Sequence, residues 1–107
     1  MTDILIEYAK MRSEKLRNSK EIAIAVRNMV KKFDDQAKII HFGSTARGDW
    51  NANSDIDILI ILKDQSMKDQ IILKVYGEFD APLELHFCTE DQFRNWYLKF
   101  IDVYKEL

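Results

Sequence analysis

The chain has 107 residues, of which 47% are hydrophobic, 3 are glycine and 1 is proline. We expect this length to form a single domain, residues 1–107, with enough apolar residues to bury a core. So few glycines and prolines exclude fibrous and low-complexity chains, and also all-β folds that need many tight turns. The single cysteine, Cys88, has no CxxC or Cys/His pattern around it, which excludes an internal disulfide framework and favours a reducing, cytoplasmic setting.

Formal charge is divided unevenly along the chain. The net charge is -2, but residues 1–32 carry eight basic and four acidic side chains, whereas residues 33–107 carry eight and fourteen. An acidic body is not typical of proteins that rely on attraction to a phosphate backbone, so we expect no nucleic-acid binding. We also expect no membrane association, because no apolar run reaches 18 residues and Met1–Lys10 lacks the pattern of a signal peptide.

Residues 1–35 predict an N-terminal helical segment. Apolar residues recur at helical spacing throughout residues 3–34. The stretch Asn18–Glu21 resembles a capping box, which makes it a candidate break between two helices, and residues 34–36 are expected to end the second. The two stripes are Leu5, Tyr8, Arg12 and Leu16, and then Ile22, Val26, Met29, Val30 and Phe33.

Residues 37–107 alternate between strand and helix patterns, which predicts an α+β fold with helices around a small sheet of at least three strands. In the most strand-like run the isoleucines alternate with Asp55, Asp57 and Leu59, so the two aspartates share one face. The predicted strands are residues 38–42, 55–62 and 82–88. We place Cys88 in the core, and His41, on the strand face of Ile39, in a packed or partly exposed position.

Two helices are predicted between and after these strands. Residues 66–76 form the first, with Met67, Ile71 and Val75 on one stripe, and Gly77 is expected to end it. A capping box at Thr89–Gln92 opens the last helix. Its aromatic stripe is expected to be mainly core, with part of it facing a partner protein; the stripe is Phe93, Trp96, Tyr97, Phe100, Ile101 and Tyr104.

The segment 43–57, between the first two predicted strands, is the most informative about chemistry. A strand that ends in Gly43-Ser44 before a helical turn exposes backbone N–H groups and a hydroxyl, which suit a phosphate. Asp55 and Asp57 then project from one strand face about 6.6 Å apart. Two neighbouring carboxylates repel each other unless a divalent cation bridges them, and such oxygen ligands suit Mg²⁺ or Mn²⁺.

The run Gly43-Ser44-x-Ala46-Arg47-Gly48, followed by Ser54-Asp55-Ile56-Asp57-Ile58, resembles the active-site signature of the polymerase β-like nucleotidyltransferases. It is most similar to their minimal archaeal and bacterial stand-alone members. The order of predicted elements extends the resemblance over most of the chain. The resemblance implies the palm-like nucleotidyltransferase fold, a small mixed sheet flanked by helices, with residues 37–107 as the catalytic core.

The resemblance also implies roles for single residues. Gly43 and Ser44 would hold the β- and γ-phosphates of a nucleoside triphosphate, which is ATP by family likeness alone. Asp55, Asp57 and a third carboxylate would bind Mg²⁺ or Mn²⁺ and carry the catalysis. Two further residues have open alternatives: Arg47 contacts a phosphate or is an exposed loop charge, and Ser54 orients the first aspartate or caps the strand. Trp50 in the same loop either stacks on a base or is a hydrophobic plug.

The third carboxylate departs from the family, in which it is usually an aspartate. The strand 82–88 offers Glu84 and His86 instead, and we assign the role to Glu84 because it can both ligate a metal and accept a proton. His86 is then a second ligand, a base, or a strand residue that faces solvent. A glutamate extends one methylene further than an aspartate, so this departure bears directly on activity.

The implied activity is metal-dependent transfer of AMP from ATP to a hydroxyl. Minimal members of the family often pair with a small helical HEPN protein, and as antitoxins they attach AMP to one of its tyrosines, which makes such a protein the expected partner. An open site in so small a domain also makes a homodimer a candidate assembly. Two alternatives are an antitoxin that acts by contact without chemistry, and a small-molecule nucleotidyltransferase, although those usually carry an additional helical domain.

Overall fold

Two consecutive helices begin the chain. The computed structural model describes residues 2–101 and 103–107. Helix α1 spans Thr2–Arg17 and helix α2 spans Ser19–Phe33, which confirms two helices separated at Asn18. The expected capping box is wrong, because the Asn18 side chain makes no capping hydrogen bond to the described N–H groups of α2.

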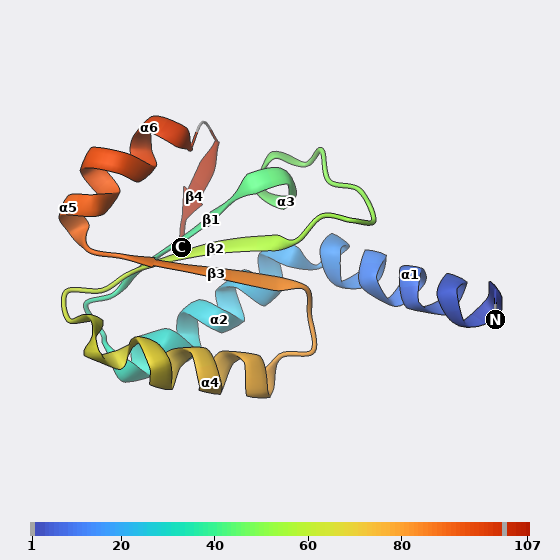
Figure 1. The fold of residues 1–107 in the computed structure, drawn as a ribbon, viewed down its shortest axis with the longest axis horizontal. Coiled ribbons are helices and arrows are strands. Elements are labelled where there is room, and N and C mark those ends of the chain that lie inside the picture. Colours follow the sequence, from blue (N-terminus) through green and yellow to red (C-terminus); the bar gives the residue numbers. More distant parts are fainter. Residues whose placement is uncertain (1, 102) are drawn as a thin grey trace.

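Four strands form one mixed sheet in the order β3-β2-β1-β4 (Figure 1). Strand β1 (Lys38–Phe42) is antiparallel to both β2 (Ile56–Ile61) and β4 (Tyr104–Glu106), and β2 is parallel to β3 (Leu83–Cys88). The predicted α+β class and the three predicted strands are confirmed. The sequence analysis missed β4, and its assignment of Tyr104 to the last helix is wrong, because the chain turns back there to pair with β1.

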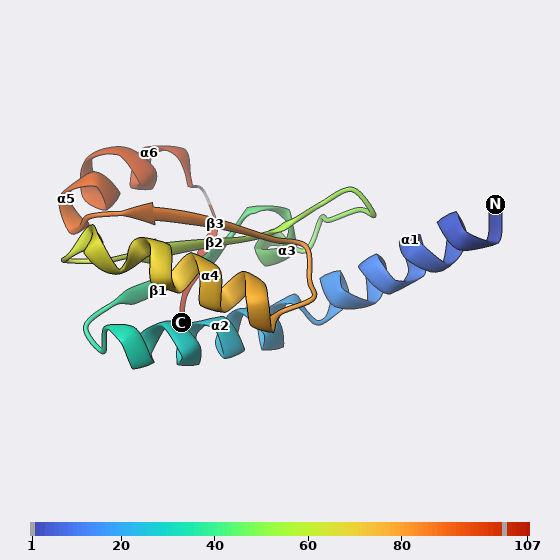
Figure 2. The same ribbon diagram turned by 60° about the horizontal axis from the view of Figure 1, so that its bottom comes forward.

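Strand β2 separates two apolar clusters on opposite faces of the sheet. Its residues Ile56, Ile58 and Ile60 are fully buried and pack against helix α2 and the later helix α4 (Lys68–Glu78), which lie together on one side of the sheet (Figures 1 and 2). The helices packed there contribute Val26, Val30, Ile71 and Val75. The opposite face carries a smaller cluster: Ile40, Leu59, Ile61, Cys88 and Phe93. The predicted alternation of β2 and the core position of Cys88 are confirmed.

Helix α4 follows a short 3-10 turn, η1 (Gln65–Met67), and spans Lys68–Glu78. Gly77 therefore lies inside α4, and the prediction that it ends the helix is wrong. The helix ends because Phe79 adopts an extended backbone, while its N–H still bonds the carbonyl oxygen of Val75. Such an ending needs no left-handed residue, so no glycine is required at this point.

The last helical segment consists of three short pieces: α5 (Glu90–Gln92), the π-helical η2 (Phe93–Tyr97) and α6 (Leu98–Phe100). The capping box between Thr89 and Gln92 is confirmed, with both reciprocal hydrogen bonds formed. The aromatic stripe is only partly core: Phe93 is buried, but Trp96 and Phe100 are 65% and 76% exposed. A π-helical turn has a longer repeat than 3.6 residues, so residues at α-helical spacing do not stay on one face.

Helix α1 projects from the body of the molecule (Figures 1 and 2), whose longest and shortest extents are 46 and 19 Å. Residues 3–11 are exposed, Arg12 is half-buried, and Leu16 is fully buried in the main core. The predicted stripe of α1 is therefore covered only at its C-terminal end. Within the described ranges, no helix is both long enough and apolar enough to cross a membrane.

Candidate active site

The pairing of β2 with β3 brings three of the predicted polar residues to one place. Asp57 lies directly opposite Glu84, and the next position on the same face of β3 is His86. Since successive residues of a strand face opposite sides, these three side chains lie on the sheet face away from the main core. The alternation that buries Ile56 and Ile58 therefore also presents Asp57 to this face.

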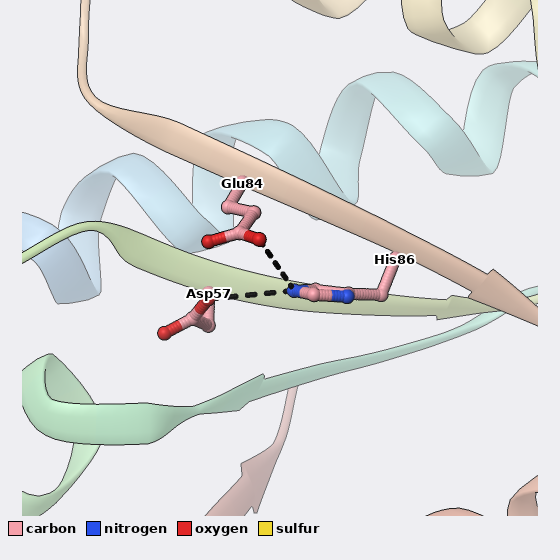
Figure 3. Close-up of side chains that lie close together, drawn as sticks. All are labelled: Asp57, Glu84 and His86. Atoms are coloured by element: carbon pink, nitrogen blue, oxygen red, sulfur yellow. Dashed lines mark hydrogen bonds and ion pairs between the residues drawn. The ribbon is translucent and has the colours of Figure 1, made fainter.

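The three side chains form a compact cluster (Figure 3). One donor atom from each lies within 4.8 Å of the donor atoms of the other two. The Nε2 atom of His86 is 3.4 Å from Oδ1 of Asp57 and 3.8 Å from Oε1 of Glu84. Asp57 is the least exposed of the three and Glu84 the most, so the cluster is open to solvent on the Glu84 side.

His86 faces two carboxylates, which shift the pKa of its imidazole upward. Its hydrogen bond with Asp57 raises the pKa of the imidazole, partial burial opposes this shift, and the charges of Glu84 and Asp57 add to it. The ring also packs against Phe42, with 5.2 Å between ring centroids. The Nε2 atom therefore lies where two carboxylates converge, a place that stabilises a cation.

The donor set fits a divalent cation. Two carboxylates are the ligands that Mg²⁺ and Mn²⁺ prefer, and the imidazole nitrogen favours a transition metal such as Mn²⁺ over Mg²⁺. Of the predicted metal ligands, Asp57 and Glu84 lie in this cluster, and His86 joins them. Asp55 is not one of its members.

Gly43 approaches the cluster more closely than any other residue type could. It has a φ of +79°, and a Cβ atom at this position would collide with Oδ2 of Asp57. The residue begins helix α3 (Gly43–Arg47), so the first N–H groups of α3 and the Asp57 carboxylate lie side by side. The geometry agrees with a glycine that lets a ligand phosphate and a metal share one site.

Helix α3 is held by a side-chain contact to β1 and by a hydrogen bond at its C-terminal end. His41 is buried on β1, and its Nε2 is 2.8 Å from Oγ1 of Thr45, the buried residue of α3. Burial, and next the charge of Lys105, lower the pKa of His41, with Asp57 opposing them. Gly48 ends α3 at a φ of +90°, and its N–H donates to the carbonyl oxygen of Ser44. Of the two positions expected for His41, the packed one is confirmed.

Ser44 and Arg47 lie on α3 but make different contacts. Ser44 is half-buried near the start of the helix, where its carbonyl oxygen accepts the bonds that close the turn. Arg47 is exposed, and its Nε lies 3.3 Å from Oδ2 of Asp49. This exposed ion pair is worth at most about 1 kcal/mol, so it leaves the arginine free to exchange partners.

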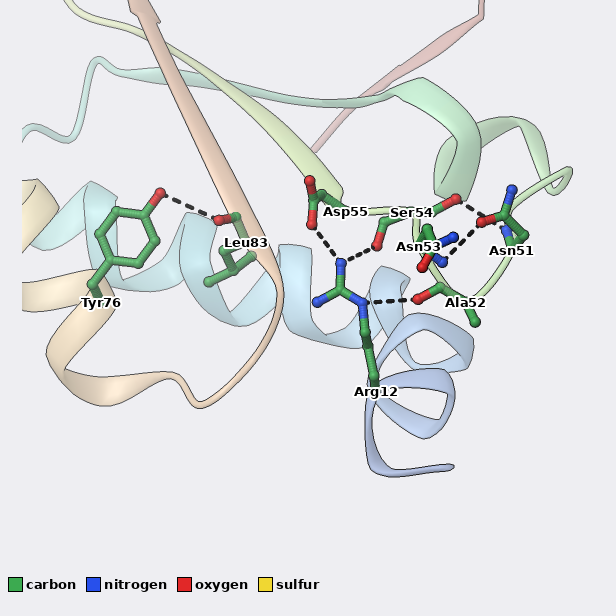
Figure 4. Close-up of polar contacts among 8 residues, drawn as sticks. All are labelled: Arg12, Asn51, Ala52, Asn53, Ser54, Asp55, Tyr76 and Leu83. Carbon is green, nitrogen blue, oxygen red and sulfur yellow. Dashed lines mark hydrogen bonds and ion pairs between the residues drawn. The ribbon is translucent and has the colours of Figure 1, made fainter. Parts of the chain in front are cut away.

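Asp55 lies just before β2 and is held by a residue from a distant part of the sequence (Figure 4). The guanidinium of Arg12 on α1 donates to Oδ1 of Asp55 and to the carbonyl oxygen of Ser54, both at 2.7 Å. It also donates to the carbonyl oxygen of Ala52 at 2.8 Å. The two aspartates of the motif therefore have different partners, Arg12 for Asp55, and Glu84 and His86 for Asp57.

The loop between α3 and β2 is ordered by its own polar groups. The hydroxyl oxygen of Ser54 accepts from the N–H of Asn51, and the side-chain oxygen of Asn51 accepts from the N–H of Asn53. Ser54 thus stabilises the loop that precedes the strand. Trp50 packs against the main core, which favours the interpretation of this side chain as a hydrophobic plug.

Arg12 is the site residue that the sequence analysis missed. The helical spacing puts Arg12 on one stripe with Leu5, Tyr8 and Leu16. A charged residue on such an apolar stripe is the signal that could have identified Arg12 as a site residue. A buried or half-buried arginine requires acceptors, and three oxygens of the loop supply them. The distance of 43 positions to Asp55 gives no local pattern that would identify the partner.

The fold and the clustered donors define a nucleotidyltransferase domain. Residues 22–105 match the family model of the nucleotidyltransferase domain, and the chain belongs to this family. The match leaves out the whole of α1, including Arg12.

Two relatives give finer comparisons. A protein of Methanocaldococcus jannaschii, named as a putative protein adenylyltransferase, is 35% identical over 54 residues, which are 49% of this chain and 54% of that protein. The chain thus matches about half the length of this relative. A crystal structure described as a putative nucleotidyltransferase from Sulfolobus solfataricus superposes with a TM-score of 0.50 at 23% identity, and covers 94% of this chain and 83% of the other. This second likeness supports the fold.

Proposed function

We propose that the domain transfers an adenylyl group from ATP to a hydroxyl of another protein, in a reaction that depends on a divalent metal ion. The observation that carries this proposal is the convergence of Asp57, Glu84 and His86 beside the glycine turn at Gly43. Membership of the nucleotidyltransferase family supports the reaction class. The name of the relative from Methanocaldococcus jannaschii, a protein adenylyltransferase, supports adenylyl as the group and protein as the acceptor.

In this reaction the acceptor hydroxyl oxygen forms a bond to the α-phosphorus, the bond to the β-phosphate oxygen breaks, and pyrophosphate leaves. A bound Mg²⁺ or Mn²⁺ would neutralise the phosphate charge and favour the oxygen nucleophile. Asp57 and Glu84 would hold the ion, and Asp55 at the end of its loop is a further ligand in this proposal. Glu84, the most exposed member of the cluster, would accept the hydroxyl proton.

The triphosphate would lie along the start of α3. Gly43 lets the Asp57 carboxylate lie directly against this turn, and the half-buried Ser44 offers its N–H and hydroxyl as donors. Arg47 would exchange its exposed partner Asp49 for a phosphate. These assignments retain the predicted phosphate roles of the three residues.

The acceptor that we propose is a tyrosine of a small helical protein of the HEPN type. The exposed apolar residues of this domain support an interaction with another protein. Trp96 and Phe100 are largely exposed, and they line a cavity of about 310 Å³ together with Phe87, Gln92 and Tyr97. Their exposure is more than a small domain needs for its own folding.

The experiment is to incubate the protein with ATP, MnCl₂ and the candidate acceptor, a co-expressed small helical protein encoded beside it. The intact mass of this acceptor is then measured. The proposal expects a gain of one AMP, absent with the double variant Asp55→Asn, Asp57→Asn. Unchanged transfer by the double variant would rule out the proposed site.

One observation favours a second candidate, an antitoxin that acts by contact alone. The cluster contains a glutamate and a histidine, and the Asp55 carboxylate is paired with Arg12. Calorimetric titration with Mn²⁺ and ATP separates the two candidates. Metal-dependent ATP binding supports the enzyme, and its absence together with a tight protein complex supports the contact function.

A further inference from the structure

Arg12 connects helix α1 to the rest of the molecule through hydrogen bonds. Its side chain is 22% exposed, and it donates three hydrogen bonds of 2.7–2.8 Å to a loop 40–43 positions away. Two of the acceptors are carbonyl oxygens and the third is a carboxylate oxygen. Because a guanidinium is a rigid fork that stays protonated, it fixes the relative positions of all three acceptors.

The loop that receives Arg12 depends on such a contact. It follows Gly48 and lies outside the sheet. Its start is held to α3 by the bond from the N–H of Asp49 to the carbonyl oxygen of Ser44, and Trp50 packs against the main core. The bonds among Asn51, Asn53 and Ser54 shape the rest of the loop but do not attach it to another element. Arg12 supplies that attachment at Ala52, Ser54 and Asp55.

Arg12 lies outside the part of the chain that the family model matches, which starts at residue 22. The helix that carries it is exposed from residue 3 to residue 11. The first aspartate of the motif thus has its position set from outside the matched domain.

We propose that Arg12 is a positioning residue, which holds the 52–55 segment and orients Asp55 so that one carboxylate oxygen is taken by the guanidinium and the other is presented to a divalent ion. Figure 4 shows this second oxygen pointing away from Arg12. The orientation of the loop is a property of the protein alone, whereas the effect on the ion rests on the proposed function. Hydrogen-bond partners of carboxylate ligands act in this way in other metal sites.

The first test reads the loop without metal or nucleotide. We expect Arg12→Met and Arg12→Lys each to speed hydrogen exchange at the N–H groups of Asn51, Asn53 and Ser54 by about tenfold. Lysine fails here because it keeps the charge but lacks the fork. The matched control is Arg17→Met, an exposed arginine of the same helix, which should leave these rates unchanged. Unchanged exchange in both Arg12 variants would overturn the proposal, whatever the activity of the protein.

The second test measures Mn²⁺ binding by calorimetry in a double-mutant cycle. Arg12→Met should weaken Mn²⁺ binding about tenfold in the wild-type background and have no effect in the Asp55→Asn background. Equal or tighter binding by Arg12→Met, or the same loss in both backgrounds, would contradict a positioning role through Asp55. If the wild-type protein binds no Mn²⁺, the proposed function fails, and hydrogen exchange still decides the role of Arg12.

Discussion

Asp55 and Asp57 are two residues apart in one motif, and the structure places them in different surroundings. Asp57 lies on β2, with His86 and Glu84 beside it and Gly43 against its carboxylate. Asp55 lies before the strand, its side chain is 44% exposed, and its partner is Arg12. The sheet therefore fixes one aspartate, whereas a helix from outside the matched domain fixes the other.

This difference shows that sequence spacing alone does not give two carboxylates the same surroundings. The rule that residues i and i+2 share a face holds only where both belong to the strand. Strand β2 begins at Ile56, so Asp55 follows the loop instead. Its direction is then set by whatever holds the loop.

The largest expected effect comes from replacing each aspartate singly. Asp57→Asn should lower adenylyl transfer at least about a thousandfold, which corresponds to roughly 4 kcal/mol of lost transition-state stabilisation. Asp55→Asn should cost about 10- to 100-fold, because the amide oxygen can still accept from Arg12 and keep the loop in place. Steady-state kinetics with a fixed acceptor checks the ratio. Equal losses for the two variants would mean that both aspartates act in the same way.

A second comparison tests how closely α3 must approach Asp57. Gly43→Ala and Gly48→Ala each place a Cβ at a left-handed backbone position, at a cost of about 1–2 kcal/mol. Only at Gly43 does the new atom collide with Asp57, whereas the space around Gly48 is open. Gly43→Ala should therefore be the less stable of the two in urea unfolding, and it alone should abolish Mn²⁺ binding.

Gly48→Ala is the control for backbone strain. If both variants lost Mn²⁺ binding to the same degree, left-handed geometry would explain the effect and contact with Asp57 would not be needed.

Much of this arrangement could be predicted from the sequence because it depends on local patterns. The alternation of residues in β2 correctly predicted that Ile56, Ile58 and Ile60 are buried, and the motif predicted the glycine turn between two strands. Parallel pairing with the third strand then brought Glu84 opposite Asp57. These features follow from side-chain periodicity and from the φ that glycine permits.

The features that could not be predicted depend on tertiary contacts. Arg12 reaches its acceptors across 43 positions, and β4 forms because a short segment around Tyr104 finds the open edge of β1. Gly77 lies inside α4, since a helix can also end on an extended residue. The π-helical turn moves Trp96 out of the core, a change that a 3.6-residue repeat does not reveal.

The two histidines extend the comparison to the two faces of the sheet. We expect NMR titration of the metal-free protein to give His86 a pKa above 6.5 and His41 a pKa below it, since carboxylates face the first and burial dominates the second. Asp57→Asn should lower the pKa of His86, because it removes the largest cause of the shift. A titration of His86 that did not change in this variant would contradict the contact with Asp57.

The same shifts predict opposite effects of pH on stability. For His86, whose pKa is raised, the stabilising contribution is fully present below pH 6.5 and is lost as pH rises through the raised pKa. For His41, whose pKa is lowered, the contribution is present above pH 6.5 and is lost as pH falls through the lowered pKa. Urea unfolding of Asp57→Asn against wild type should thus differ more at pH 6 than at pH 8.

The smallest expected effect concerns the outer edge of β3, the strand that carries Glu84. The Tyr76 hydroxyl of α4 donates to the carbonyl oxygen of Leu83 and accepts from the N–H of Leu85, both at 3.3 Å (Figure 4 shows the first of these bonds). Tyr76→Phe should lower the free energy of unfolding by about 0.5–1.5 kcal/mol, since both bonds are long and the residue is half exposed. Leu73→Ala, on the same helix and 76% exposed, is a matched control that should change stability by less than about 0.5 kcal/mol. Because Asp57 is held by the central strand β2, Tyr76→Phe should leave the distance between the two aspartates unchanged. Any effect of this variant on Mn²⁺ binding should come through Glu84. A change in hydrogen exchange at the 51–55 loop would show instead that the sheet and the Arg12 contact are coupled.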